Sequence, residues 1–182
     1  MDNLLVMLES LVLIALGLVS LLAGRRWLRV LAGVVGFALG WWLMSLMALA
    51  GLRLVVGVMV GLILAGLIRF AGKWARHSLV AIAGFVTVPM VLGSLGMLGG
   101  ISEFVWAVFG AVLSVACAFY QIEWTLIILS AILGAGLILN GAQVFLDTVR
   151  LGYLLSEAFC LIMGSILSGV GIFIQARQQQ RT

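Results

Sequence analysis

Seven long apolar stretches, separated by short segments that carry most of the charges, dominate this sequence of 182 residues. A helix that crosses the roughly 30 Å hydrocarbon core of a bilayer needs about 20 mainly apolar residues. The stretches are apolar at both odd and even positions, whereas a membrane strand alternates over about 10 residues. We expect transmembrane helices at residues 4–23, 28–50, 54–68, 79–98, 104–119, 125–142 and 153–174.

Composition excludes the soluble classes of protein. Hydrophobic residues make up 65% of the chain and charged residues 9%, against about 25% charged in a typical soluble domain. The mean hydropathy of +1.33 leaves too little polar surface to cover a water-soluble globule. The sequence therefore predicts an all-α polytopic membrane bundle, a single membrane domain over residues 1–182 with a short cytoplasmic tail at residues 175–182.

The charge distribution predicts the orientation of this bundle. Cytoplasmic segments of membrane proteins carry an excess of lysine and arginine. The first and third connecting segments and the C-terminus hold eight of the ten cations: Arg25, Arg26, Arg29, Arg69, Lys73, Arg76, Arg177 and Arg181. We expect the N-terminus outside and the C-terminus in the cytoplasm, in a bacterial inner membrane or a eukaryotic secretory or plasma membrane.

Three similar units follow one another with a period of about 50 residues. Trp27, Trp74 and Trp124 mark equivalent positions, 47 and 50 residues apart. A glycine follows each tryptophan, and another lies in the preceding span of each unit: the first set is Gly36, Gly84 and Gly134, and the second is Gly17, Gly61 and Gly110. We expect three parallel hairpin repeats over about residues 4–50, 54–98 and 104–142, followed by a single C-terminal helix at 153–174.

Small residues and one proline predict how the helices pack. Lipid supplies no hydrophobic force between helices, so close backbone approach at small residues holds a membrane bundle together. Gly36 and Gly40 in the second span, and Gly57 and Gly61 in the third, are expected to serve this purpose. Pro89 lies within the fourth span and is expected to kink it.

Several motifs resemble the transmembrane protein 198 family. Residues 24–29 read GRRWLR, residues 31–40 read LAGVVGFALG, and the glycine-rich segments at 57–66 and 125–136 read GVMVGLILAG and TLIILSAILGAG. The resemblance covers the seven-span layout over nearly the whole chain, without the long cytoplasmic tail of animal members. It implies a membrane scaffold that helps to assemble a signalling receptor complex, and it carries over no catalytic residues.

Two acidic residues, Glu9 and Glu157, fall inside the expected spans. Each lies four or five residues from the outer boundary, a depth of about 6–8 Å at about 1.5 Å per residue. Ionisable groups within the bilayer are costly and mark candidate functional sites. One interpretation is a paired acidic site that binds a proton or a cation. The other is that each carboxylate reaches the interface or pairs with Arg53 or Arg150.

Two further sets of polar residues are candidates for contacts. Asn140, Gln143 and Thr87 are expected to form interhelical hydrogen bonds, which contribute on the order of 1 kcal/mol each. Five basic residues form a candidate surface for anionic lipid headgroups or a partner protein: Arg25, Arg26, Arg29, Lys73 and Arg76. Their role in setting the membrane topology is enough to explain why they are present.

No constellation for catalysis accompanies these residues. His77 has no second histidine or cysteine at ligand spacing, Cys117 and Cys160 are expected to be apolar fillers, and no phosphate-binding glycine loop is present. We expect no enzyme activity, catalytic residue, metal, cofactor or nucleic-acid partner.

The favoured hypothesis is therefore a scaffold, assembly factor or accessory subunit that contacts lipid and either membrane-protein partners or further copies of itself. The alternative is a small ion or solute channel or transporter, in which the three repeats surround a pseudo-threefold axis and the acidic pair forms the site.

Overall fold

A computed structural model of the chain describes residues 2–23, 28–46, 52–67, 75–94, 101–149 and 156–179, and the described residues form helices and no strands. The helices, in chain order, are α1 (Asp2–Ala23), α2 (Leu28–Leu46), α3 (Arg53–Leu67), α4 (Ala75–Ser94), α5 (Ile101–Thr148) and α6 (Glu157–Gln179). All six are rich in apolar side chains. The hydroxyl of Ser156 caps the start of α6, where it accepts a hydrogen bond from the Phe159 backbone amide. The all-helical prediction is confirmed over these residues.

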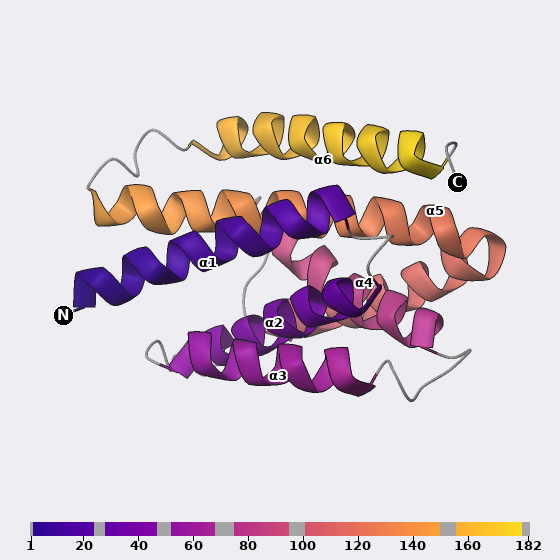
Figure 1. Cartoon of the computed structure of the whole chain (residues 1–182), viewed down its shortest axis with the longest axis horizontal. Helices are drawn as coiled ribbons and strands as arrows, with labels where there is room; N and C mark the ends of the chain where they lie inside the picture. The colour runs from indigo at the N-terminus through magenta and orange to yellow at the C-terminus, as the bar shows by residue number, and fades with distance from the viewer. Residues whose placement is uncertain are drawn as a thin grey trace.

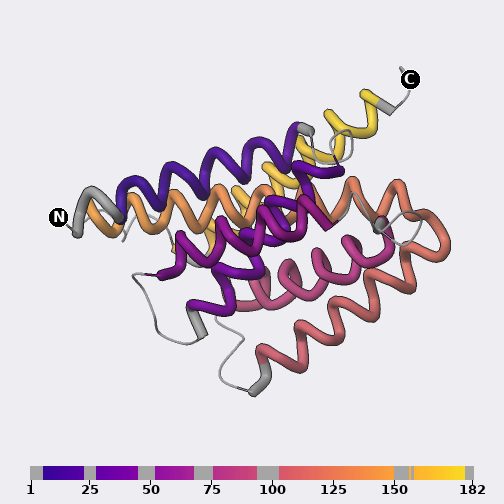
Figure 2. Tube along the Cα trace, turned by 60° about the horizontal axis from the view of Figure 1, so that its bottom comes forward, coloured from indigo at the N-terminus to yellow at the C-terminus, as the bar shows by residue number. Residues whose placement is uncertain are grey.

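A sharp turn at Gln121 divides α5 into two helical arms, residues 101–120 and 122–148. The backbone angles of Gln121, φ −149° and ψ 79°, are not helical, and Figure 2 shows the two arms folding back from this turn. The arms coincide with the two spans predicted at 104–119 and 125–142. Among the described residues, α5 is therefore the one of the six helices that this turn divides in two.

Three helices contain segments long and apolar enough to cross a membrane, within Arg76–Gly93, Glu103–Thr148 and Ala158–Gln178. The other three described helices have shorter apolar segments, Val6–Leu22, Leu28–Met44 and Arg53–Leu67. A membrane protein is the class that these helices fit.

The helices lie side by side and run in alternate directions (Figure 1). We call the end at which α1, α3, α5 and α6 begin the amino end of the bundle. The exposed side chains of Arg29, Arg76 and Arg177 belong to the opposite end, because α2 and α4 begin there and α6 finishes there. We call this end the basic end.

The closest helix pairs are α2 with α3, α4 with α5 and α1 with α5. The predicted hairpins 4–50 and 54–98 are not the main packing units, since α1 touches α2 only slightly and α3 packs mainly on α2. The reason is the position of the glycines, which lie where α2 meets α3 and where α1 and α4 meet α5.

Backbone contact at glycines joins each of these three pairs. A Cβ atom on Gly17 of α1 would lie 2.7 Å from the carbonyl oxygen of Gly134 in the second arm of α5, and a Cβ on Gly134 would lie 2.7 Å from that of Gly17. At the α2–α3 crossing a Cβ on Gly36 would lie 2.9 Å from the Cα of Gly61. The backbones are therefore closer than any larger residue permits.

The third crossing joins α4 to the first arm of α5 in the same way. A Cβ atom on Gly110 would meet the carbonyl oxygen of Gly84, and a Cβ on Gly84 would meet that of Gly110. Thus Gly17, Gly61 and Gly110 each contact a glycine of the other set, and the partners are Gly134, Gly36 and Gly84 respectively.

The last helix is longer than predicted. Residues 175–179 were expected to begin a cytoplasmic tail, but they continue α6, and Gln175 is only 2% exposed. Figure 1 shows α6 lying along α5 and α1 on the outside of the bundle. Its polar C-terminal turns are held by hydrogen bonds that hydropathy does not reveal.

Candidate functional site

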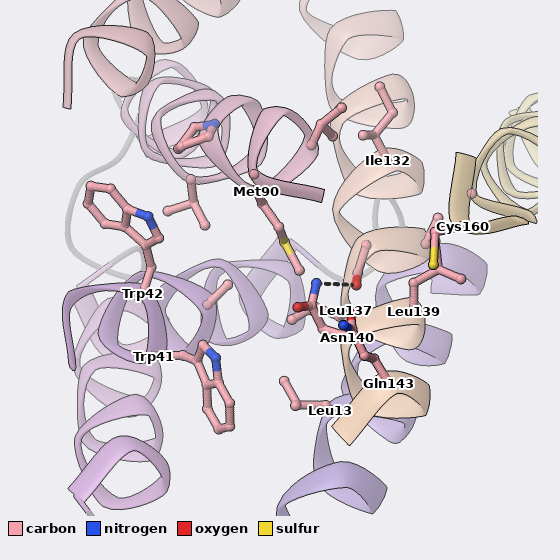
Figure 3. A pocket seen from close by; sticks show the side chains of 18 of the residues that line it. Leu13, Trp41, Trp42, Met90, Ile132, Leu137, Leu139, Asn140, Gln143 and Cys160 are labelled. Atoms are coloured by element: carbon pink, nitrogen blue, oxygen red, sulfur yellow. Dashed lines mark hydrogen bonds between the residues drawn. The ribbon is translucent and has the colours of Figure 1, made fainter. Parts of the chain in front are cut away.

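A cavity of about 660 Å³ opens between the helices in the half of the bundle nearest the amino end. Its lining comes from the second halves of α2 and α4, from the starts of α3 and α5, from the second arm of α5 and the first half of α6, and from Leu13 of α1. This volume lies within the range of about 300–1,000 Å³ that is typical of small-molecule sites. Figure 3 shows Trp41 and Trp42 on one side of the cavity and Asn140 on the other.

Equivalent positions of the three sequence units line this cavity. Two residues after Gly36, Gly84 and Gly134 lie Ala38, Val86 and Gly136. Five residues after the same glycines lie Trp41, Pro89 and Leu139, and six residues after them lie Trp42, Met90 and Asn140. All nine belong to the cavity lining.

The same helix faces close the bundle toward the basic end. On each of these helices, the residues one and five positions before the glycine lie on the same face as the cavity lining, because they follow it at helical spacing. The residues one position before are Val35, Ala83 and Leu133, and those five positions before are Leu31, Leu79 and Leu129. All six are buried and belong to one hydrophobic cluster. We call these six residues the apolar plug. The cavity is therefore a vestibule with an apolar floor.

Four polar or charged side chains lie near the mouth of this cavity. Arg53 at the start of α3 and Glu103 near the start of α5 supply charges, and Asn140 and Gln143 near the end of α5 supply amides. Arg53 and Glu103 are half-buried, and the Nε atom of Arg53 is buried without a hydrogen-bond partner in the described structure. Arg53 was expected here merely as a partner for an acid, and Glu103 was not among the expected site residues.

Arg53 is also close enough to Glu9 of α1 to act on its carboxylate electrostatically. Glu9 and Arg53 occupy equivalent positions, eight residues before Gly17 and Gly61. The arrangement agrees with the interpretation in which Glu9 pairs with a nearby arginine. Glu157 is the first residue of α6, its side chain lies outside the described structure, and the acidic pair of Glu9 and Glu157 stays a prediction.

The hydrogen bonds of Thr87 and Asn140 lie within their own helices. The Thr87 hydroxyl donates to the Ala83 carbonyl at 2.6 Å, and the Asn140 amide nitrogen donates to the Gly136 carbonyl at 2.9 Å. Both carbonyls are four residues earlier, which is within easy reach of a helical side chain. These side-chain hydrogen bonds of Thr87 and Asn140 therefore do not cross between helices as expected. The side chain of Gln143 is exposed and lines the cavity.

A buried polar cluster that the sequence analysis missed supplies the interhelical bonds instead. The Gln175 amide nitrogen donates to the carbonyl oxygens of Leu21 at 2.9 Å and Ser20 at 3.4 Å. The Ser20 hydroxyl donates to the Ser130 carbonyl at 2.9 Å, and the Ser130 hydroxyl lies 3.1 Å from the Gln175 side-chain oxygen. We call Ser20, Ser130 and Gln175 the polar clamp, and it joins α1, α5 and α6.

The candidate basic surface is described in part. Arg29 and Arg76 are exposed in the first turns of α2 and α4, at the basic end. Arg25, Arg26 and Lys73 lie outside the described residues. Binding of anionic lipid there stays a prediction.

Metal-ligating groups are dispersed in the described part of the chain, where no group of three or more His, Cys, Asp or Glu comes together. Cys117 is exposed on α5, and Cys160 is half-buried where α6 borders the cavity. The His77 ring packs against Phe119 with centroids 5.6 Å apart.

Comparison of the chain with family models, with curated proteins and with solved structures gave no match. The proposals below therefore rest on the site itself.

Proposed function

We propose that this chain is a seven-span membrane protein in which three two-helix repeats surround a pseudo-threefold axis, with α6 outside the ring. The proposal is supported by the three glycine contacts, in which the first helix of each repeat meets the second helix of another. Gly61 of the second repeat meets Gly36 of the first, Gly110 of the third meets Gly84 of the second, and Gly17 closes the ring on Gly134. A cyclic set of contacts is what three equivalent units around one axis require.

We further propose that the protein binds a small solute on this axis, as part of a transport path and without enzyme activity. The observation that carries the proposal is that nine residues at three equivalent sets of positions line one cavity. The cavity closes at the apolar plug, so the arrangement corresponds to a transporter open at its amino end. Arg53 of α3 and three residues of α5, Glu103, Asn140 and Gln143, line the cavity. They give a transport path more polar groups than Glu9 and Glu157 would provide alone.

Accessibility of introduced cysteines tests both parts of the proposal. In a background with Cys117→Ser and Cys160→Ser, we expect Asn140→Cys to react with a charged, membrane-impermeant thiosulfonate added to intact cells. Leu133→Cys, about two turns deeper on the same helix face and fully buried in the plug, is the matched control and is expected to resist the reagent.

Two results would contradict the proposal. Equal protection of both cysteines from outside would remove the open vestibule, while reaction of Asn140→Cys exclusively in inside-out vesicles would reverse the orientation. Flux of radiolabelled solutes into proteoliposomes, compared between the unmodified and the Asn140→Cys-labelled protein, then tests transport, and we expect the label to block it.

A scaffold or self-associating subunit is the second candidate, and it is supported by one face of α6. Ser165 and Gly169 lie four residues apart on this helix and are both exposed, and nothing lies within 4 Å of a Cβ built on Gly169. Small residues at this spacing favour association between membrane helices. Chemical crosslinking in native membranes tests it, because Gly169→Leu is expected to abolish a specific crosslinked species.

A further inference from the structure

We propose that the cavity takes a hydrophobic organic cation, held by the Glu103 carboxylate and the indole faces of Trp41 and Trp42. This inference deepens the proposed function and rests on it, since it names the class of ligand that the axial cavity binds. Four properties of the lining support it: its charge, its aromatic wall, its amide acceptor and its apolar body.

The charges around the cavity include one more carboxylate than guanidinium. Arg53 and Glu103 both line the cavity. Glu9 does not line it, but it lies close enough to Arg53 to interact with it electrostatically. Two carboxylates therefore share one guanidinium in this part of the bundle, and a bound cation would complete the balance of charge.

Ring contacts connect the aromatic wall to the start of α5, where Glu103 lies. Glu103 is followed in α5 by Phe104, whose ring meets that of Phe85 edge to face with centroids 6.0 Å apart. Phe85 in turn meets Trp42 edge to face at 5.5 Å. These contacts fix Trp42 on the side of the cavity from which Glu103 approaches. Tryptophan is the aromatic side chain that attracts a cation most strongly through the face of its ring.

Asn140 adds an acceptor on the opposite wall. One N–H of its amide donates to the Gly136 carbonyl, and in Figure 3 its oxygen turns away from that bond toward the open cavity. A carbonyl dipole with its negative end in the cavity favours a cation over an anion. The remaining wall contains Leu13, Val86, Met90 and Leu137, which suit the apolar body of such a ligand.

The experiment uses two probes of the same shape and opposite charge, tetraphenylphosphonium and tetraphenylborate. Binding to the full chain in lipid nanodiscs is measured by equilibrium dialysis, with empty nanodiscs subtracted. The variant Gly136→Phe measures binding outside the cavity. Gly136 lines the cavity, a Cβ atom there meets only the flexible end of Met90, and the added ring is expected to fill the cavity. We expect the phosphonium to bind the unaltered protein, and Gly136→Phe to abolish that binding.

Substitutions at the wall then test the contacts. Glu103→Gln is expected to weaken phosphonium binding about tenfold, which corresponds to about 1.4 kcal/mol. Asp147→Asn is the matched control, because Asp147 is an exposed acid at the same end of the bundle and does not line the cavity. Trp42→Leu is expected to weaken binding several-fold, whereas Trp106→Leu, at an exposed tryptophan outside the cavity, is expected to leave it unchanged.

The outcomes separate the ligand class from the cavity itself. If tetraphenylborate binds as tightly as the phosphonium, Glu103→Gln has no effect, and Gly136→Phe abolishes both, the cation inference is overturned and the solute-binding cavity stands. If Gly136→Phe changes the binding of neither probe, the cavity does not bind them and both proposals fall. Circular dichroism and size-exclusion profiles confirm that each variant is folded before it is compared.

Discussion

Replacing a crossing glycine by alanine is the most direct test of how this bundle is held together. In Gly17→Ala the new Cβ would lie 2.7 Å from the Gly134 carbonyl oxygen and 2.9 Å from the backbone nitrogen of Ile138. Ordinary contact begins at 3.4 Å, so α1 and α5 must separate by about 0.7 Å. Backbone atoms cannot rotate out of the way as the end of a side chain can.

The expected cost follows from overpacking. Extra methylene groups in a well-packed interior cost about 1–3 kcal/mol, and the helix propensity of alanine over glycine returns at most about 1 kcal/mol. We expect Gly17→Ala, Gly61→Ala and Gly110→Ala each to lower the free energy of unfolding by about 1–2 kcal/mol. Similar costs at the three positions are expected because each meets a carbonyl oxygen of a facing helix within 2.7 Å.

Unfolding in mixed detergent micelles, followed by the fluorescence of the tryptophans, measures these free energies. Gly66→Ala and Gly169→Ala are the matched controls, because nothing lies within 4 Å of a Cβ at either position. We expect both controls to be neutral or slightly stabilising. Crossing variants as stable as these controls would refute the argument that close backbone approach at the three crossings stabilises the bundle.

Two further predictions concern the polar clamp and the proline. Gln175→Leu removes the donors to the Ser20 and Leu21 carbonyls and is expected to destabilise the protein by about 1–2 kcal/mol in the same unfolding assay. Gln178→Leu, at an exposed position of α6, is the control. Equal destabilisation by the two substitutions would contradict the role of the polar clamp. Pro89→Ala restores an amide that can donate to the carbonyl four residues earlier, and it is expected to stabilise α4 by about 1–3 kcal/mol; protection of that amide from hydrogen exchange measures the new bond, and rapid exchange would contradict it.

Much of the secondary structure was predictable from local signals. The apolar runs predicted the helical class, and the spans expected at 104–119 and 125–142 fall on the two sides of the turn at Gln121. The end of α6 was not predictable in this way, because residues 175–179 have the polarity of a tail. Gln175 stays in the helix because it reaches Ser20 and Leu21, more than 150 residues earlier in the chain.

The candidate site was predictable in its parts but not as a whole. The repeat identified the two sets of glycines, and Asn140 and Gln143 were singled out as polar residues within or near a span. Glu103 was not, because an acid near the start of a helix looks like an ordinary interfacial residue. Its place in the cavity follows from the packing of α5 against the other helices, which the sequence alone does not reveal.

Hydropathy alone was sufficient to predict the helical class and the approximate positions of the described helices. It was silent on which helix faces meet, because an apolar side chain has nearly the same free energy against lipid as against another helix. Two short-range effects determine which faces meet. They are close backbone approach at glycine and the need of buried amides and hydroxyls for hydrogen-bond partners. Both depend on atoms that lie in different helices, as between Gly17 and Gly134 or between Gln175 and Leu21, so they exist only in the folded bundle.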